Sequence, residues 1–226
     1  MSYMDNTKPF DVLIFDWDGT LMDSEAHIVS CLDVAMREVG VEPHPADELK
    51  QVIGLGLYEA LAALMPKEDA SVHQQATEAY RQFFLSGDAT PSELFPGVES
   101  ALQQLHREGF QLAVATGKSR RGLDKVMRQT RMESLFSITR CADESFSKPH
   151  PQMLEEILTD LDTAAHRALM IGDTEFDLQM AANIGMPSLA VSYGVHDVEH
   201  LLTHKPLAIL DHMGDLPEWL DSYLVN

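Results

Sequence analysis

The sequence predicts an α/β fold in which a Rossmann-like parallel sheet is flanked by helices and carries an inserted all-helical segment. From about residue 98 onward, short apolar runs alternate with stretches of helical periodicity, a pattern typical of a parallel sheet covered on both faces. An earlier apolar run, Val12–Phe15, has no polar alternation and therefore predicts a strand buried on both faces. Between these two parts, only helical patterns occur.

The inserted segment predicts at least three helices. Apolar residues recur at helical spacing from Ile28 to Val39, and Gly40 follows as a C-cap. Two further helices are expected over Leu57–Met65 and Val72–Phe84, with Pro66 between them. We therefore expect a core made of residues 1–20 and 91–226, and a helical cap over residues 21–90. Gly54 and Gly56 predict a turn of this cap that faces the core.

The remaining elements follow in regular alternation, and Gly or Pro marks several of their ends. Helices are expected over Val98–Arg107, Arg121–Thr130, Pro151–Asp160 and Phe176–Ile184. Strands are expected over Gln111–Ala115, Ser137–Thr139, Ala168–Ile171 and Ser188–Val191. The hinges between core and cap are expected near Leu21–Asp23 and Ser86–Leu94.

The composition excludes several classes of partner. With 36 acidic residues against 16 Lys and Arg, the formal charge of −20 argues against nucleic acid and anionic membranes as partners. No signal peptide and no apolar stretch long enough to cross a bilayer is recognisable. Two cysteines, Cys31 and Cys141, are too few and too far apart for a disulfide framework or a zinc site. A cytoplasmic protein, monomeric or a weak homodimer, is expected.

Four short polar stretches lie directly after four of the predicted strands. Because parallel strands end at the same edge of a sheet, these stretches should meet there. Taken singly, each has a simpler interpretation as a turn, a solvated lysine or a helix cap, but their joint occurrence in this order favours a common site. They are Asp16-Trp17-Asp18-Gly19-Thr20, Thr116-Gly117-Lys118, Lys148-Pro149 and Gly172-Asp173-Thr174-Glu175-Phe176-Asp177.

The charge of such a site requires a cation. Four of its residues are carboxylates, and a phosphate group would add about two more negative charges. Two unit charges roughly 4 Å apart repel by about 4 kcal/mol at an effective dielectric constant of about 20. Lys148, a divalent cation and a proton on Asp18 would offset most of this charge. Oxygen ligands and a phosphoryl partner favour Mg²⁺ over zinc.

These motifs resemble those of the haloacid dehalogenase superfamily of hydrolases, specifically the subfamily with a helical cap between the first and second motifs. Phosphoglycolate phosphatases and β-phosphoglucomutases belong to the same branch. The resemblance covers essentially the whole chain, and all four motifs occur in order.

The resemblance implies a role for each motif residue. Asp16 would attack phosphorus and form an aspartyl-phosphate that water later hydrolyses. Asp18 would protonate the leaving alcohol and then activate that water. Thr116 and the backbone N–H of Gly117 would hold the phosphoryl oxygens, and Lys148 would neutralise charge on the nucleophile and the phosphoryl group.

The resemblance also implies a set of Mg²⁺ ligands. Asp16, Asp173 and Asp18, the last through its main-chain carbonyl, would bind the metal. Asp177 would support them, directly or through water. The expected substrate is a small phosphorylated metabolite.

Details of the motifs favour one activity within the superfamily. Dehalogenases lack the second aspartate of the first motif, whereas this chain has Asp18. β-Phosphoglucomutases follow the motif's glycine with valine or isoleucine and use an arginine early in the cap, whereas this chain has Thr20 and an uncharged stretch over residues 52–57. We therefore predict a Mg²⁺-dependent phosphatase of the phosphoglycolate phosphatase type, with an intramolecular phosphomutase as the alternative.

Two other classes fit less well. A non-catalytic phosphate-binding module would commonly lack one of Asp16, Asp18, Lys148 or Asp173, and none is missing. A two-component receiver lacks a helical insertion of this size.

Several other residues lie in or near these motifs or recur at regular spacing, and each carries an expectation. Lys118, Arg120 and Arg121 follow the phosphate-binding threonine, and one of the three is expected to steer an anionic substrate. The second motif has Gly117 where phosphoglycolate phosphatases usually have asparagine, and Trp17 is expected to pack beside the site. A further group, His196, His200 and His204, recurs at helical spacing and is predicted to be a solvated helix face.

Overall fold

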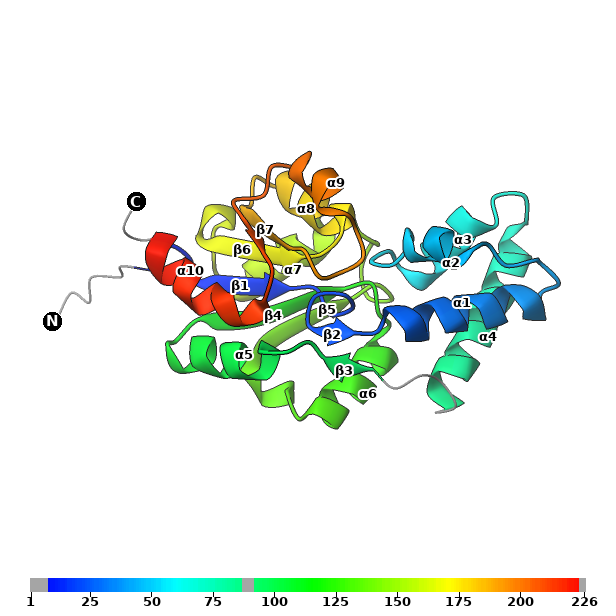
Figure 1. Ribbon diagram of the computed structural model, residues 1–226, viewed down its shortest axis with the longest axis horizontal. Coiled ribbons are helices and arrows are strands. Elements are labelled where there is room, and N and C mark those ends of the chain that lie inside the picture. The colour runs from blue at the N-terminus through cyan, green and yellow to red at the C-terminus, as the bar shows by residue number, and fades with distance from the viewer. Residues whose placement is uncertain (1–7, 87–91, 224–226) are drawn as a thin grey trace, which may run out of the picture.

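The computed structural model describes residues 8–86 and 92–223, and its centre is a six-stranded sheet in which every pairing is parallel (Figure 1). The strand order is β5-β4-β1-β6-β7-β8. The predicted Rossmann-like fold is confirmed. The strands are β1 (Val12–Phe15), β4 (Gln111–Thr116), β5 (Phe136–Cys141), β6 (Ala168–Gly172), β7 (Ser188–Val191) and β8 (Ile209–Leu210).

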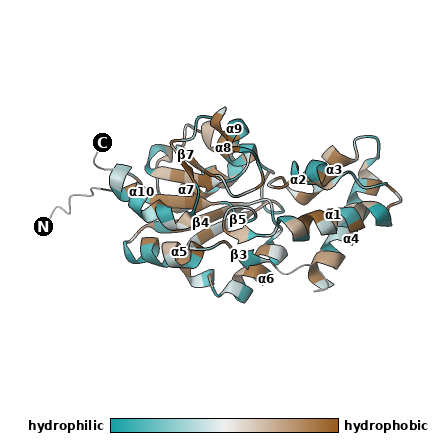
Figure 2. Ribbon diagram, viewed as in Figure 1, coloured by the Kyte–Doolittle hydropathy of each residue, from teal (hydrophilic) through white to brown (hydrophobic). Residues whose placement is uncertain are grey.

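The central strand β1 is buried on both faces, as its unbroken apolar sequence requires. Leu13 and Phe15 face a cluster packed beneath α5 (Val98–Arg107), α6 (Arg120–Thr130) and α10 (Leu216–Tyr223). Val12 and Ile14 point the other way, toward α7 (Gln152–Asp160) and α8 (Glu175–Ala182). Figure 2 shows hydrophobic residues along the central strands and mixed colouring on the helices.

The helical segment between β1 and β4 has a hydrophobic cluster of its own. It comprises α1 (Glu25–Glu38), α2 (Ala46–Lys50), α3 (Leu57–Leu64) and α4 (Ala70–Ser86), seen at the right of Figure 1. A two-stranded antiparallel ladder, β2 (Met22–Asp23) with β3 (Glu93–Leu94), lies at its base. We refer to α1–α4 and their connections as the cap. Its limits at residues 21 and 90 remain a prediction, and residues 87–91, which include the second limit and part of the second hinge, lie outside the described residues.

Several elements differ from the expectation. The structure adds β2, β3, β8, α2, α9 (Val198–Leu202) and α10, and β5 is longer than the three residues predicted. Pro151 lies at the N-cap of α7 and not inside it. Short 3₁₀ helices occur at Glu133–Leu135, Ala165–Arg167 and Met213–Asp215. Within the described ranges, no helix combines the length and apolarity needed to cross a bilayer.

Candidate active site

The structure brings the four polar stretches together at the carboxyl edge of the sheet. Asp16 follows β1 directly, Thr116 is the last residue of β4, and Asp173 follows β6. Since β4, β1 and β6 are neighbours, these residues lie side by side. The loop after β5 contributes Lys148. All four are buried, with exposed fractions of 1% or less.

Lys148 joins two of the carboxylates. Its Nζ lies 2.8 Å from Oδ1 of Asp16 and 2.6 Å from Oδ1 of Asp177. Burial alone would lower the pKa of Lys148, but the two carboxylates outweigh it and raise that pKa above the ordinary value. The ammonium group is therefore charged and fixed beside Asp16.

Asp177 also begins the helix that follows. Its Oδ2 accepts hydrogen bonds from the Thr174 hydroxyl at 2.8 Å and the Thr174 N–H at 3.2 Å, in a capping box at the start of α8. The helix-cap interpretation of this stretch is confirmed, and Asp177 also lies beside Lys148. Both oxygens of Asp177 are bonded to protein groups, which fits a supporting position.

Asp173 is enclosed by Thr20, Val195 and two glycines. Its Oδ1 accepts a hydrogen bond from the Thr20 hydroxyl at 2.7 Å, and its Oδ2 accepts one from the Val195 N–H at 2.9 Å. A Cβ at Gly19 or Gly194 would lie 2.1 or 2.2 Å from the Asp173 side chain, so both positions need glycine. Burial, and then the nearby Asp177, raises the pKa of Asp173 to about 7.

One carboxylate oxygen in this group has no partner. Oδ2 of Asp16 is buried and makes no hydrogen bond with any described residue. Burial raises the pKa of Asp16 well above its ordinary value; Lys148 opposes this shift, and Asp177 and Asp173 add to it. Carboxylate oxygens of Asp16, Asp173 and Asp177 lie within 4.8 Å of one another. An unpaired buried oxygen among three acids and one lysine fits a hard divalent cation such as Mg²⁺.

Asp18 lies apart from these three carboxylates. Lys118 Nζ approaches its two oxygens at 2.8 and 2.9 Å, and the Ser24 hydroxyl donates to Oδ1 at 2.5 Å. Ser24 stands at the entrance to the cap, directly before α1. The Asp18 side chain is thus engaged with Lys118 and Ser24, which leaves its main-chain carbonyl for a metal.

The cap touches the core at Gly117. A Cβ on this residue would lie 2.4 Å from the carbonyl oxygen of Leu55 and 2.7 Å from that of Gly54. Any side chain at this position, including the asparagine that the resemblance to phosphoglycolate phosphatases implies, would collide with the cap. The turn around Gly54 and Gly56 therefore faces the site, and the Gly56 N–H donates to the Ser147 hydroxyl at 2.7 Å.

A cavity of about 700 Å³ lies between cap and core. Its floor is polar and belongs to the core, with Asp16, Asp18, Thr116 and Lys118. Its roof is formed by the cap. The roof residues include Ile28, Leu32, Val52, Leu57, Tyr80 and Phe84.

A family comparison agrees with this geometry. The family model described as haloacid dehalogenase-like hydrolase matches residues 13–191, which include all four motifs and the cap. The chain belongs to this family.

Relatives of this hydrolase are similar over nearly their full length. A probable phosphatase named IndB from Dickeya dadantii is 32% identical, with 91% of each chain covered. A phosphoglycolate phosphatase from Aliivibrio fischeri is 28% identical over 88% of this chain and 92% of the relative. The crystal structure of a putative haloacid dehalogenase-like hydrolase from Bacteroides fragilis superposes with a TM-score of 0.85 at 24% identity, over 92% of this chain and 99% of that one.

The three cations that follow Thr116 have different partners in this hydrolase. Lys118 is buried against Asp18. Arg120 binds both carboxylate oxygens of Glu144 and the Thr139 carbonyl and hydroxyl. Arg121 is exposed, lines the cavity, and forms no ion pair with a described residue. Of the three, Arg121 is therefore the one available to an incoming anion.

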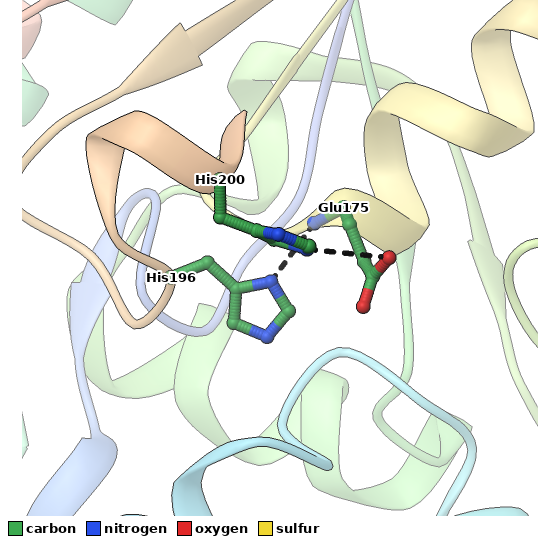
Figure 3. A group of neighbouring side chains, drawn as sticks. All are labelled: Glu175, His196 and His200. Carbon is green, nitrogen blue, oxygen red and sulfur yellow. Dashed lines mark hydrogen bonds and ion pairs between the residues drawn. The ribbon is translucent and has the colours of Figure 1, made fainter. Parts of the chain in front are cut away.

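One prediction about the histidines of this hydrolase is wrong. The prediction of a solvated helix face is wrong for His196, which precedes α9 and is 4% exposed. Figure 3 shows it beside His200 and Glu175, a group whose ligand atoms lie within 4.8 Å. Nδ1 of His196 accepts a hydrogen bond from the Glu175 N–H at 3.1 Å, so its lone pair is committed to the backbone. The helical spacing alone did not show where α9 begins.

Proposed function

We propose that this hydrolase is a Mg²⁺-dependent phosphatase that cleaves small phosphate monoesters through an aspartyl-phosphate on Asp16. The observation that carries the proposal is the Asp16 carboxylate: Lys148 holds one oxygen at 2.8 Å, and the other is buried and makes no hydrogen bond with any residue that the structure describes. An oxygen in this state is available for attack or for a metal. The relatives named as phosphatases support the same activity.

The phosphoryl group binds where the ends of β1 and β4 meet. The Thr116 hydroxyl and the Gly117 N–H donate hydrogen bonds to its non-bridging oxygens, and the Lys148 ammonium neutralises charge from the other side. Thr116 Oγ1 accepts a hydrogen bond from the Lys118 N–H at 3.2 Å, which orients the hydroxyl proton away from that contact.

In the first step, an oxygen of Asp16 forms a bond to phosphorus as the bond between phosphorus and the leaving oxygen breaks. Asp18 donates its proton to the departing alkoxide, so that the alcohol leaves neutral. Asp18, which accepts hydrogen bonds from Lys118 and Ser24 in the structure, takes up this proton from solvent as the ester binds, and the same two residues hold it in place for the transfer.

In the second step, water attacks phosphorus and the bond to Asp16 breaks. Asp18, now ionised, takes the proton of this water, and inorganic phosphate leaves with Asp16 restored as a carboxylate. One residue thus serves as acid and then as base, and the cap limits access of bulk water.

The residues that would hold Mg²⁺ are Asp16, Asp173 and the main-chain carbonyl of Asp18, with Asp177 in support. When bound, the metal would reduce repulsion between the carboxylates and the phosphoryl oxygens. Burial, with the neighbouring carboxylates adding to it, raises the pKa of Asp16 and of Asp173, and such an ion would offset this cost of negative charge.

We also infer a cytoplasmic location and a monomer or weak homodimer. Both cysteines are free and buried, which is typical of a reducing compartment.

The proposal is tested by phosphate release from a panel of phosphorylated metabolites with Mg²⁺ and without any bisphosphate. Release in simple buffer with Mg²⁺ supports the phosphatase. Conversion of a sugar phosphate without phosphate release, and only with a sugar bisphosphate present, would favour the mutase. Full activity in excess chelator would contradict the metal requirement.

A further inference from the structure

The roof of the cavity is a surface that the phosphoryl chemistry does not use. A space of about 700 Å³ would hold roughly twenty waters at about 30 Å³ each. A phosphoryl group with a two-carbon acid attached fills only a small part of it. The site therefore has room for a much larger alcohol.

The chemistry of the roof is mainly apolar. Ile28 and Leu32 of α1, Val52 of the loop between α2 and α3, and Leu57 of α3 line it, all with aliphatic side chains. The charged cap residues on the lining, Glu78 and Arg81, are exposed and lie outside the buried part of the wall. Apolar walls favour a ligand that removes comparable apolar area from water, at about 25 cal/mol per Å².

Two aromatic rings extend this wall. Tyr80 and Phe84 of α4 are stacked, with ring centroids 6.0 Å apart and planes 10° apart. Lys118 and Lys125 already approach the Phe84 ring at 4.9 and 5.3 Å. Tyr80 has no such cation contact with the described residues, and its ring remains available to a ligand.

The Tyr80 hydroxyl is also uncommitted. It forms no hydrogen bond with any residue that the structure describes, although the side chain is partly buried on the cavity wall. Burial, followed by Cys31 and Asp18, raises the pKa of Tyr80, and both Tyr80 and Asp18 line the cavity.

We propose that the preferred substrate is a phosphate ester of an alcohol carrying a ring-sized, mainly apolar group, which the cap roof binds between its aliphatic side chains and Tyr80. This inference rests on the proposed phosphatase activity and narrows its substrate class. A short acidic leaving group would leave the roof unfilled. Of the cations that line the cavity among the described residues, Lys118 is already paired with Asp18, and Arg81 and Arg121 are exposed.

The experiment compares two esters with matched leaving groups. Ethyl phosphate and naphthylethyl phosphate both release a primary alcohol, so a difference in kcat/KM reports binding of the ring and not leaving-group reactivity. We expect kcat/KM to be at least about tenfold higher for the naphthylethyl ester, a factor equivalent to about 1.4 kcal/mol. Phosphoglycolate serves as the small acidic comparison.

A matched pair of variants tests whether the ring of the substrate binds against the cap roof. Ala60 of α3 is buried and lines the cavity, whereas Ala63 of the same helix is exposed. Ala60→Phe fills the roof and should lower the ratio of kcat/KM between the two esters toward one. Ala63→Phe adds the same ring outside the cavity and should leave that ratio unchanged. If Ala60→Phe does not fold, Tyr80→Leu should lower the ratio instead, because it removes the ring and the hydroxyl.

The possible failures are distinguishable. Equal or higher kcat/KM for ethyl phosphate or phosphoglycolate would overturn the inference and leave the phosphatase standing. A ratio that stays high in both Ala60→Phe and Tyr80→Leu would likewise overturn it. No phosphate release from any ester with Mg²⁺ would overturn the proposed function and the inference together.

Discussion

The floor and the roof of the cavity differ in chemistry and in origin. The floor belongs to the core: its side chains are charged or polar, buried, and joined by short contacts, such as the one of 2.8 Å between Lys118 and Asp18. The roof belongs to the cap, and its side chains are mainly apolar and joined by packing alone. Charged groups at fixed distances can carry out a reaction, whereas an apolar wall can only select what is bound. The floor therefore carries out the reaction, and the roof selects the substrate.

The largest effect should come from the floor. Asp16→Asn removes the nucleophile, and kcat should fall by at least about a thousandfold. Phosphate release from a generic aryl phosphate measures this loss, and circular dichroism checks the fold. Asp221→Asn makes the same chemical change at an exposed carboxylate of α10 and should retain activity. Retained activity in a clean preparation of Asp16→Asn would refute the assignment of the nucleophile.

The next effect tests whether Lys118 acts through Asp18. Lys118→Met leaves Asp18 without its ammonium partner, and kcat should fall by about a hundredfold, the lower end of what general acid–base catalysis contributes. KM should change far less. Lys125→Met is the control, because Lys125 also lies near Phe84 but is not bonded to Asp18. Equal losses in the two variants would show that Lys118 matters only for packing against Phe84.

Metal binding should depend on pH in a defined direction. Without metal, Asp173 has a raised pKa of about 7, so below that pH the carboxyl group holds a proton that Mg²⁺ must displace. The apparent affinity for Mg²⁺ should therefore rise with pH, by up to about tenfold per unit below pH 7, and level off above it. Calorimetric titrations between pH 5 and about 8.5 measure this slope. An affinity independent of pH would contradict the placement of the metal at Asp173.

The smallest effect belongs to the mouth of the cavity. Arg121→Gln should lower kcat/KM by a few-fold at low salt, because it removes an exposed cation that attracts the phosphate, and the difference should shrink as salt is added. Arg120→Gln should instead lower the melting temperature with little change in kcat/KM, since Arg120 is bonded to Glu144 and Thr139. If Arg120→Gln instead lowered kcat/KM and Arg121→Gln instead lowered the melting temperature, the assignment of Arg121 to phosphate attraction would be wrong.

Much of the floor could be predicted from the sequence because the position of each residue depends on the strand directly before it. A buried strand followed by a carboxylate places that carboxylate at the sheet edge, whatever the rest of the chain does. The structure indeed brings Asp16, Thr116, Lys148 and Asp173 together. The pairing of Lys118 with Asp18 was not foreseen, because the two are a hundred residues apart and nothing local distinguishes a paired lysine from a free one.

The roof was less predictable for a physical reason. Helical periodicity shows which face of each helix is apolar, but not which part of that face packs inward and which part borders a cavity. Leu61 is buried within the cap, whereas Leu57 of the same helix lines the cavity. In the same way, the periodicity of the histidines did not reveal that His196 is buried beside Glu175. Such distinctions depend on how elements pack against one another.

The central claim is that the phosphoryl group of the substrate is transferred to Asp16. The most direct test is an acid quench during steady turnover, followed by mass spectrometry of the peptide that contains Asp16. The account predicts a phosphoryl group on Asp16, more abundant in Asp18→Asn because the second step is slowed. Turnover with no phosphorylated peptide under either condition, or with the group on another residue, would contradict it.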